Sequence, residues 1–117
     1  MILCVMDDLL FSVKISTAAK SKGGVELFFE RSPEMVLPRI REKLPSLVIF
    51  DLNSARMNPL EAIAGMKADA VLKGIRTLGF VSHVDSETIT AARAAGLDQV
   101  LARSAFAAQL GEILTSA

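Results

Sequence analysis

The sequence predicts an α/β fold in which one five-stranded parallel sheet is covered by helices on both faces, the doubly wound arrangement. Several short runs are apolar throughout, without the polar alternation of a half-exposed strand, which is typical of strands buried on both faces. Each run is followed by a segment whose apolar residues recur at helical spacing. Because strands and helices alternate, the connections are expected to be right-handed crossovers between parallel strands.

Residues 2–6 predict the first strand, at a central position in the sheet. The run is apolar throughout and ends in Asp7-Asp8. Between this acidic pair and Lys22, apolar residues share one helical face while the lysines lie mostly elsewhere, which predicts the first helix. Gly23-Gly24 then stops that helix.

The second strand is predicted at residues 25–29, at an outer position of the sheet. Glu26 interrupts its otherwise apolar run, which fits an outer strand better than a central one. Ser32-Pro33 then predicts a helix start, because serine can cap a helix and proline loses no hydrogen bond in the first turn. This helix is expected to reach about Lys43, with Pro38 kinking or shortening it.

The third strand ends in a carboxylate. Residues 47–50 form an unbroken apolar run, and Asp51 follows directly at its carboxyl end. In open parallel sheets this is the edge where ligands bind, so Asp51 is a candidate functional residue. Asn58-Pro59 then predicts a helix start, with Glu61 completing a capping box, and the helix is expected to continue until Gly74.

Two further pairs of strand and helix complete the chain. Residues 75–81 predict the fourth strand, and Asp85 is expected to cap a helix that Gly96 terminates. Residues 99–102 predict the fifth strand, after which Arg103-Ser104 leads into the last helix. The apolar residues of that helix share one face: Phe106, Leu110, Ile113 and Leu114.

Composition limits the class of protein. Its 117 residues suffice for one domain and are too few for two, so residues 1–117 are expected to form a single unit. Lys plus Arg and Asp plus Glu both number 13, which removes the electrostatic argument for binding nucleic acid or an anionic membrane. A single cysteine, Cys4, rules out a disulfide within the chain. Because the sequence has neither a transmembrane-length apolar run nor a signal-peptide pattern, we expect a cytoplasmic protein.

Polar residues at the ends of the predicted strands form the candidate site. Because parallel strands all point the same way, the residues at their carboxyl ends gather along one edge of the sheet. Carboxylates brought together there repel one another and raise their own pKa values unless a cation lies between them. A divalent ion that prefers oxygen ligands, most plausibly Mg²⁺, would meet this requirement. The residues expected at this edge are Asp7, Asp8, Asp51, Ser82 and Arg103.

This constellation resembles the receiver domains of bacterial two-component response regulators, over essentially the whole chain. The resemblance extends to residues 94–98, which read Ala-Ala-Gly-Leu-Asp before the fifth strand. It implies a flavodoxin-like sheet with strand order 2-1-3-4-5, and phosphoryl transfer to Asp51 from a histidine kinase or phosphotransfer protein. The implied roles are phosphoacceptor for Asp51, contacts to the phosphoryl group for Ser82 and Arg103, and Mg²⁺ ligation for Asp7, Asp8, Asp51 and the backbone of Asn53.

The chain departs from the family pattern at several positions. Arg103-Ser104 stands where the family has lysine followed by proline, and a planar guanidinium does not substitute for a compact ammonium in a small site. Val100 stands where an aromatic side chain reports the active state, and His83 stands where a small residue follows the Ser/Thr. The loop after the third strand reads Ser54-Ala55-Arg56, without the usual proline and glycine.

Two functions therefore stay open, and so do two alignments of the residues after the first strand with the acidic positions of the family. The first function is a stand-alone receiver-like signalling domain that is phosphorylated on Asp51. The alternative is a degenerate receiver that acts as a phosphorylation-independent protein interaction module, and neither function is enzymatic. A gapless alignment also places Met6 and Asp7, instead of Asp7 and Asp8, in the acidic positions.

Two other functional classes fit the residues less well. An aspartyl-phosphate hydrolase would use Asp51 as a nucleophile and needs a second acid two residues later, where the chain has Asn53. A flavin- or nucleotide-binding protein needs a turn rich in Gly or Ser/Thr after the first strand, where Asp7-Asp8 would repel phosphate. His83, the only histidine, is expected to be solvated or hydrogen-bonded.

The last two helices are the expected partner surface. Residues 86–95 and 104–116 are rich in alanine and carry few charges, and small uncharged faces let helices pack closely. We expect a homodimer or a downstream protein partner to use this surface.

Overall fold

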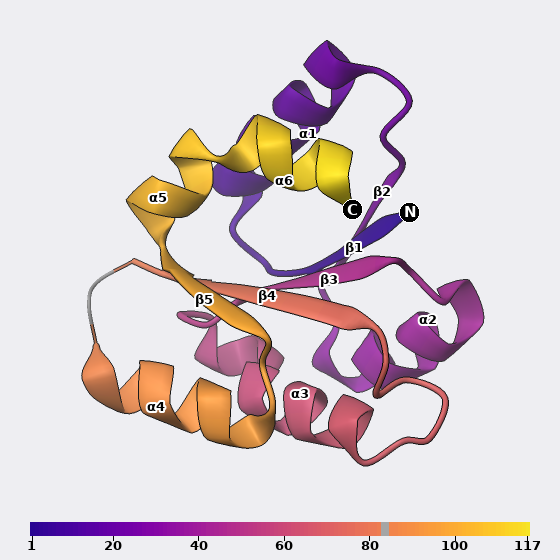
Figure 1. Cartoon of the computed structure of the whole chain (residues 1–117), viewed down its shortest axis with the longest axis vertical. Coiled ribbons are helices and arrows are strands. Elements are labelled where there is room, and N and C mark those ends of the chain that lie inside the picture. The colour runs from indigo at the N-terminus through magenta and orange to yellow at the C-terminus, as the bar shows by residue number, and fades with distance from the viewer. Residues whose placement is uncertain (83–84) are drawn as a thin grey trace.

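The computed structural model of the chain describes residues 1–82 and 85–117 and confirms the predicted fold class (Figure 1). Its strands form one parallel sheet in the predicted order, β2-β1-β3-β4-β5. The strands are β1 (Ile2–Val5), β2 (Leu27–Glu30), β3 (Leu47–Asp51), β4 (Arg76–Val81) and β5 (Gln99–Ala102). His83 and Val84 lie outside the described residues, so the interpretation of His83 stays a prediction.

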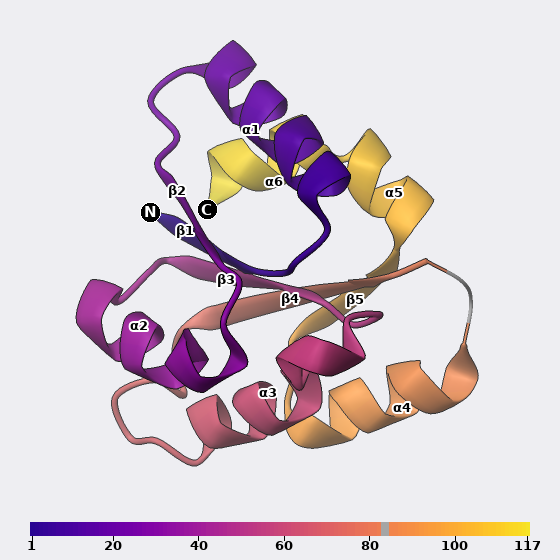
Figure 2. The ribbon, with the colours of Figure 1, turned by 180° about the vertical axis from the view of Figure 1, so that it is seen from behind.

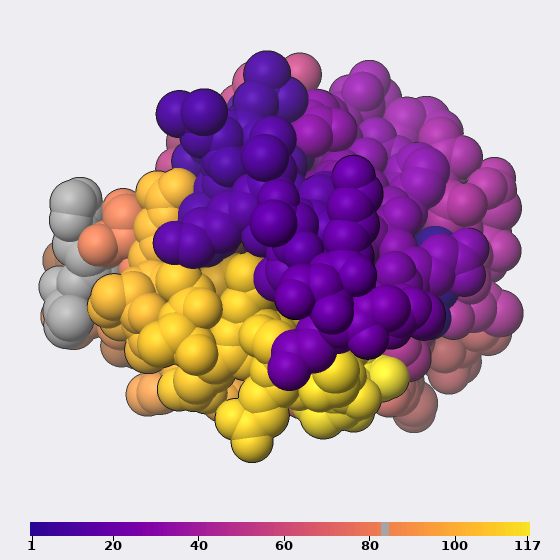
Figure 3. All heavy atoms as spheres, turned by 90° about the horizontal axis from the view of Figure 1, so that it is seen from above, coloured from indigo at the N-terminus to yellow at the C-terminus, as the bar shows by residue number. Residues whose placement is uncertain are grey.

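The helices form two layers, one on each face of the sheet (Figures 1 and 2). The helical elements are α1 (Leu9–Lys22), η1 (Pro33–Met35), α2 (Val36–Lys43), η2 (Ala55–Met57), α3 (Pro59–Lys67), α4 (Ser86–Ala95), α5 (Arg103–Ala108) and α6 (Leu110–Ser116). α1, α5 and α6 cover one face, where α1 and α6 pack together (Figure 3), and α2, α3 and α4 cover the other. Among residues 1–82 and 85–117, no helix is long and apolar enough to span a membrane.

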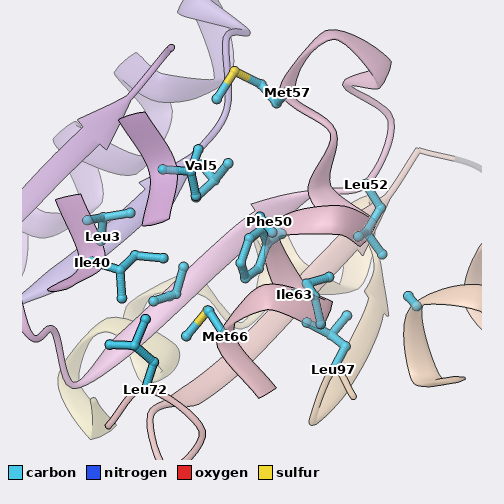
Figure 4. Close-up of a cluster of buried hydrophobic side chains, with 14 of the residues drawn as sticks. Leu3, Val5, Ile40, Phe50, Leu52, Met57, Ile63, Met66, Leu72 and Leu97 are labelled. Atoms are coloured by element: carbon cyan, nitrogen blue, oxygen red, sulfur yellow. The ribbon is translucent and has the colours of Figure 1, made fainter. Parts of the chain in front are cut away.

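Each layer of helices encloses its own hydrophobic core. Successive residues of β1 and β3 point alternately into the two cores, which explains why their apolar runs show no polar alternation. Leu3 and Phe50 point into the core beneath α2 and α3 (Figure 4). In the other core, the rings of Phe11, Phe80 and Phe106 pack with centroids 4.8 to 5.8 Å apart.

The third helix is shorter than the sequence predicts. α3 ends at Lys67 and does not continue to Gly74. The carboxylate of Asp69 accepts hydrogen bonds from the backbone N–H groups of Val71 (2.8 Å) and Leu72 (3.2 Å) and so stabilises a turn in place of another helical turn. A second difference concerns the C-terminal helix, which is divided between α5 and α6.

Helical turns begin after Ser32, Asn58 and Asp85 as predicted, but a capping hydrogen bond is confirmed only for Asp85. Asp85 caps α4, because its side chain accepts hydrogen bonds from backbone N–H groups in the first turn. The side chains of Ser32 and Asn58 make no capping hydrogen bond; the chain passes through η1 after Ser32, and Asn58 is left-handed with φ 47°. Pro38 lies in the first turn of α2, where backbone N–H groups have no helical acceptor, so the helix tolerates it by starting only at Val36.

Gly79 in β4 offers a test of the core. A Cβ atom at this position would lie 2.6 Å from Cδ2 of Leu97 and 2.9 Å from Cδ1 of Leu52. Gly79→Ala should therefore lower the free energy of unfolding by about 1–3 kcal/mol, the usual cost of overpacking a core. Urea denaturation measures this change.

Gly74→Ala is the matched control, because no atom lies within 4 Å of a Cβ placed there. It should change the free energy of unfolding by less than about 0.5 kcal/mol. Leu97→Val removes the clashing methyl group, so the double variant with Gly79→Ala should lose less stability than the two single losses added together. Equal effects of the two alanine substitutions would contradict this packing of β4.

Candidate functional site

The register of the sheet brings the predicted polar residues to one edge. Parallel strands end at nearly the same level there, so the residues that follow them emerge together. The last paired residues are Val5 with Phe50, Asp51 with Phe80, and Val81 with Ala102. The residues at this edge, here called the rim, are Asp7, Asp8, Asp51, Ser82 and Arg103.

Asp51, the last residue of β3, is half-buried at the rim. Its Oδ1 accepts a hydrogen bond from the backbone N–H of Asn53 (2.9 Å). Burial raises the pKa of Asp51, and the negative charges of Asp8 and Asp7 raise it further. The Asn53 N–H and the positive charge of Arg103 act in the opposite direction. Asp51 therefore shares one electrostatic environment with the other charged rim residues.

Asp8 joins the start of α1 to the start of α5. Its Oδ1 accepts a hydrogen bond from the backbone N–H of Phe11 (2.9 Å), which caps α1, and its Oδ2 accepts one from Nη2 of Arg103 (2.8 Å). The Phe11 N–H, followed by Arg103, lowers the pKa of Asp8. The guanidinium of Arg103 also lies over the Phe11 ring, 4.3 Å from its centroid. Arg103 is thus held by a carboxylate and an aromatic ring at once.

Asp7 faces the loop that follows β3. Its Oδ1 accepts a hydrogen bond from the hydroxyl of Ser54 (2.8 Å), and its Oδ2 accepts one from Nη1 of Arg56 (3.3 Å). The same nitrogen of Arg56 donates to the backbone carbonyl of Arg31 (2.9 Å). Arg56 therefore ties this loop to the ends of β1 and β2, a role that sequence reasoning missed although the loop's cation is visible in the sequence.

The Met6 side chain does not face the rim. Met6 is fully buried, in the core beneath α1 and α5. Asp7 and Asp8 are both partly exposed and turn toward different partners. The two carboxylates after β1 that reach the rim are therefore those of Asp7 and Asp8.

Asn53 links two rim residues through its backbone and its side chain. The backbone N–H donates to Asp51, and the side-chain Oδ1 accepts a hydrogen bond from the backbone N–H of Ser82. Ser82 itself is exposed at the end of β4. Sequence reasoning gave a role only to the backbone of Asn53 and missed the contact made by its side chain.

The rim side chains, as arranged here, do not fit a divalent ion. Within residues 1–82 and 85–117, no three His, Cys, Asp or Glu side chains are grouped so that they could hold a metal. Oxygen donors are present, but Asp7 and Asp8 are already paired with Arg56 and Arg103. With Asp51, the rim and Arg56 together hold three carboxylates and two guanidiniums, which leaves one net negative charge.

The sequence matches no protein-family model and no curated protein. The structure is similar to many solved structures. A response regulator from Hahella chejuensis has a TM-score of 0.85 at 16% identity, covering 97% of this chain and 92% of that one. The phosphorylated cyanobacterial phytochrome response regulator RcpA has a TM-score of 0.81 at 23% identity, covering 98% and 88%. The Mn²⁺-bound form of response regulator Rcp1 has a TM-score of 0.79 at 18% identity, covering 96% and 89%.

These similarities span nearly the whole chain. At identities of 16% to 23% they bear on the fold and leave the chemistry to be argued from the residues. The chain has the fold of response-regulator receiver domains.

Proposed function

We propose that this chain is a receiver-type signalling domain that acts through protein contacts and not as an enzyme. In this proposal, arginines neutralise the acidic residues after β1 in place of a divalent cation. The observation that supports it is the pairing of Asp7 with Arg56 and of Asp8 with Arg103.

The two ion pairs compete with any metal for the same carboxylates. Each pair is partly exposed, with 33% exposure of either aspartate side chain, 61% of Arg56 and 40% of Arg103. Each therefore contributes less than about 1 kcal/mol, and together they weaken Mg²⁺ binding by up to about thirtyfold. Mg²⁺ also gives up its hydration shell reluctantly. Both effects act against a metal-dependent reaction at Asp51.

A second candidate is phosphorylation of Asp51 by a histidine kinase or a phosphotransfer protein. The position of Asp51 favours it, because this carboxylate is half-buried on the same rim as Ser82 and Arg103. Of the similar structures, RcpA is phosphorylated and Rcp1 binds Mn²⁺. A carboxylate oxygen of Asp51 would bond to phosphorus as the P–N bond of a phosphohistidine breaks. Mg²⁺ at the predicted ligands would require both acidic residues after β1 to leave their arginines.

The partner surface on the last helices remains a proposal. In both candidates the output passes to a downstream protein or a second copy of the chain, and we expect this to occur in the cytoplasm. Within the described part of the chain, α4, α5 and α6 expose no large hydrophobic side chain, so binding there would depend on close packing of alanines. The exposed large hydrophobic residues are Leu9, Leu10, Val13, Met35, Leu44, Leu60 and Val71.

Divalent-ion binding distinguishes the two candidates. If arginines neutralise the acidic residues, millimolar Mg²⁺ should raise the melting temperature of the wild type no more than it raises that of Asp51→Asn. The same result is expected when beryllofluoride is added. The double variant Arg56→Gln/Arg103→Gln frees both acidic side chains and should gain a Mg²⁺-dependent rise. Thermal melts followed by circular dichroism measure both.

The control removes two positive charges away from the rim. Arg76→Gln/Arg93→Gln changes two exposed arginines that form no ion pair within the described residues, and it should gain no response to Mg²⁺. A ligand at a hundred times its dissociation constant adds about 2.7 kcal/mol to stability, so a shift is easily seen. A Mg²⁺-dependent rise in the wild type that Asp51→Asn lacks would favour the phosphoacceptor candidate.

The two aspartates should respond oppositely to neutralisation. Asp51→Asn should raise the free energy of unfolding at pH 7, because burial raises the pKa of this carboxyl and makes its charge unfavourable in the folded state. Asp8→Asn should lower it by about 0.2–1 kcal/mol, because asparagine still caps α1 but loses the ion pair with Arg103. Urea denaturation over a series of pH values measures both.

The two effects fade in different pH ranges. The gain from Asp51→Asn is full above the raised pKa of Asp51 and disappears as the pH falls to about 3.9, the pKa of an unfolded aspartate. The loss from Asp8→Asn persists to lower pH and disappears only below the lowered pKa of Asp8. Effects of the same sign at pH 7 would contradict the charge distribution described for the rim.

A further inference from the structure

A groove of about 490 Å³ lies between α2 and α3, the helices that lie side by side beneath the sheet (Figures 1 and 2). Its floor is apolar and includes the buried side chains of Val36, Met57 and Ala62. Leu37 and Pro38 of α2 add an apolar wall. The volume is within the range of sites that bind ligands or side chains of a partner.

The groove also carries unpaired negative charge. Glu34 and Glu61 line it, both are exposed, and neither has an ion-pair partner within residues 1–82 and 85–117. The one cation of the lining, Arg41, is already paired with Asp69 (3.2 Å). The groove therefore combines an apolar floor with negative charge.

Two partly exposed apolar residues are sequence neighbours of the two glutamates that line the groove. Met35 and Leu60, which adjoin Glu34 and Glu61 in the sequence, are 36% and 37% exposed. The apolar floor of the groove and its two glutamates match a ligand that carries both apolar and basic groups.

We propose that the α2–α3 groove is a docking site for a basic amphipathic helical segment of a partner protein. Apolar side chains of that segment would fill the groove, and flanking Lys or Arg side chains would pair with Glu34 and Glu61. A second copy of this chain fits less well. Its exposed apolar and basic helix face, on α1, lies across the sheet from the groove, so self-docking would build open chains of molecules and not a closed dimer.

The docking site is contiguous with the Asp51 rim. Within the segment that follows β3, Ser54 and Arg56 contact Asp7, while Met57 and Asn58 line the groove. A bound segment that shifts Met57 or Asn58 would therefore also move Arg56, the adjoining residue that neutralises Asp7. This inference does not depend on whether Asp51 is phosphorylated.

The binding test uses a labelled probe and the full chain. The probe is a fluorescein-labelled helix of about four turns, built only from Leu and Lys at amphipathic spacing, and fluorescence anisotropy measures its binding at low salt. The wild type should bind it saturably, and Glu34→Gln/Glu61→Gln should weaken binding about tenfold. The matched control, Glu26→Gln/Glu112→Gln, removes two exposed glutamates that likewise form no ion pair within the described residues, and it should change the affinity less than about twofold.

Chemical-shift mapping places the bound probe. Backbone shifts should concentrate on α2, η2 and α3 and should include Arg56. Equal weakening by the two double variants, shifts confined to α1 or to α4–α6, or no saturation up to about 1 mM probe would overturn the proposal. Sedimentation of the wild type without the probe measures self-association. If the chain self-associates and Glu34→Gln/Glu61→Gln abolishes this, a second copy of the chain occupies the groove, and the assignment to a partner protein is overturned.

Discussion

Three carboxylates at one end of a parallel sheet repel one another, and the site of this protein depends on how that repulsion is reduced. Asp7, Asp8 and Asp51 cannot avoid one another, because the strands that carry them run side by side in the same direction. Arg56 and Arg103 neutralise the two that follow β1. The remaining charge falls on Asp51, where burial makes it least favourable and raises the pKa. The site therefore concentrates its electrostatic cost on one residue.

Neutralisation by side chains connects this charge to the helices in a way that a free ion would not. Arg103 begins α5, pairs with the residue that caps α1, and lies over the ring of Phe11. Phe11 in turn packs against Phe80 of β4, with ring centroids 5.0 Å apart. The charge of Asp51 interacts with that of Arg103, so packed groups connect the rim to the layer formed by α1 and α5.

The sequence predicts those features that depend on periodicity and chain direction. Unbroken apolar runs identify the central strands. Because these strands are parallel, the residues that follow β1 and β3 must lie at one edge of the sheet, and the rim can be predicted without knowing any interatomic distance. The cap of α4 by Asp85 was predicted, but other features that depend on single side-chain hydrogen bonds were missed. Nothing in the pattern around Asp69 indicates that it ends a helix, and the hydroxyl of Ser54 reaches Asp7 across 47 positions of sequence. The path of a loop decides such contacts, and apolar spacing carries no information about it.

Preorganisation explains how two partly exposed ion pairs can hold the rim. An exposed pair usually contributes little, because two long side chains lose freedom when they form it. Here the groups beside each arginine are anchored in the cores. Arg56 precedes Met57, whose side chain is 1% exposed and packs beneath the sheet (Figure 4), and Arg103 lies over the buried ring of Phe11. Packing of the cores therefore already restricts each arginine side chain. As a result, less conformational entropy is lost when the ion pair forms. The cores of the fold and the charges of the rim therefore stabilise each other.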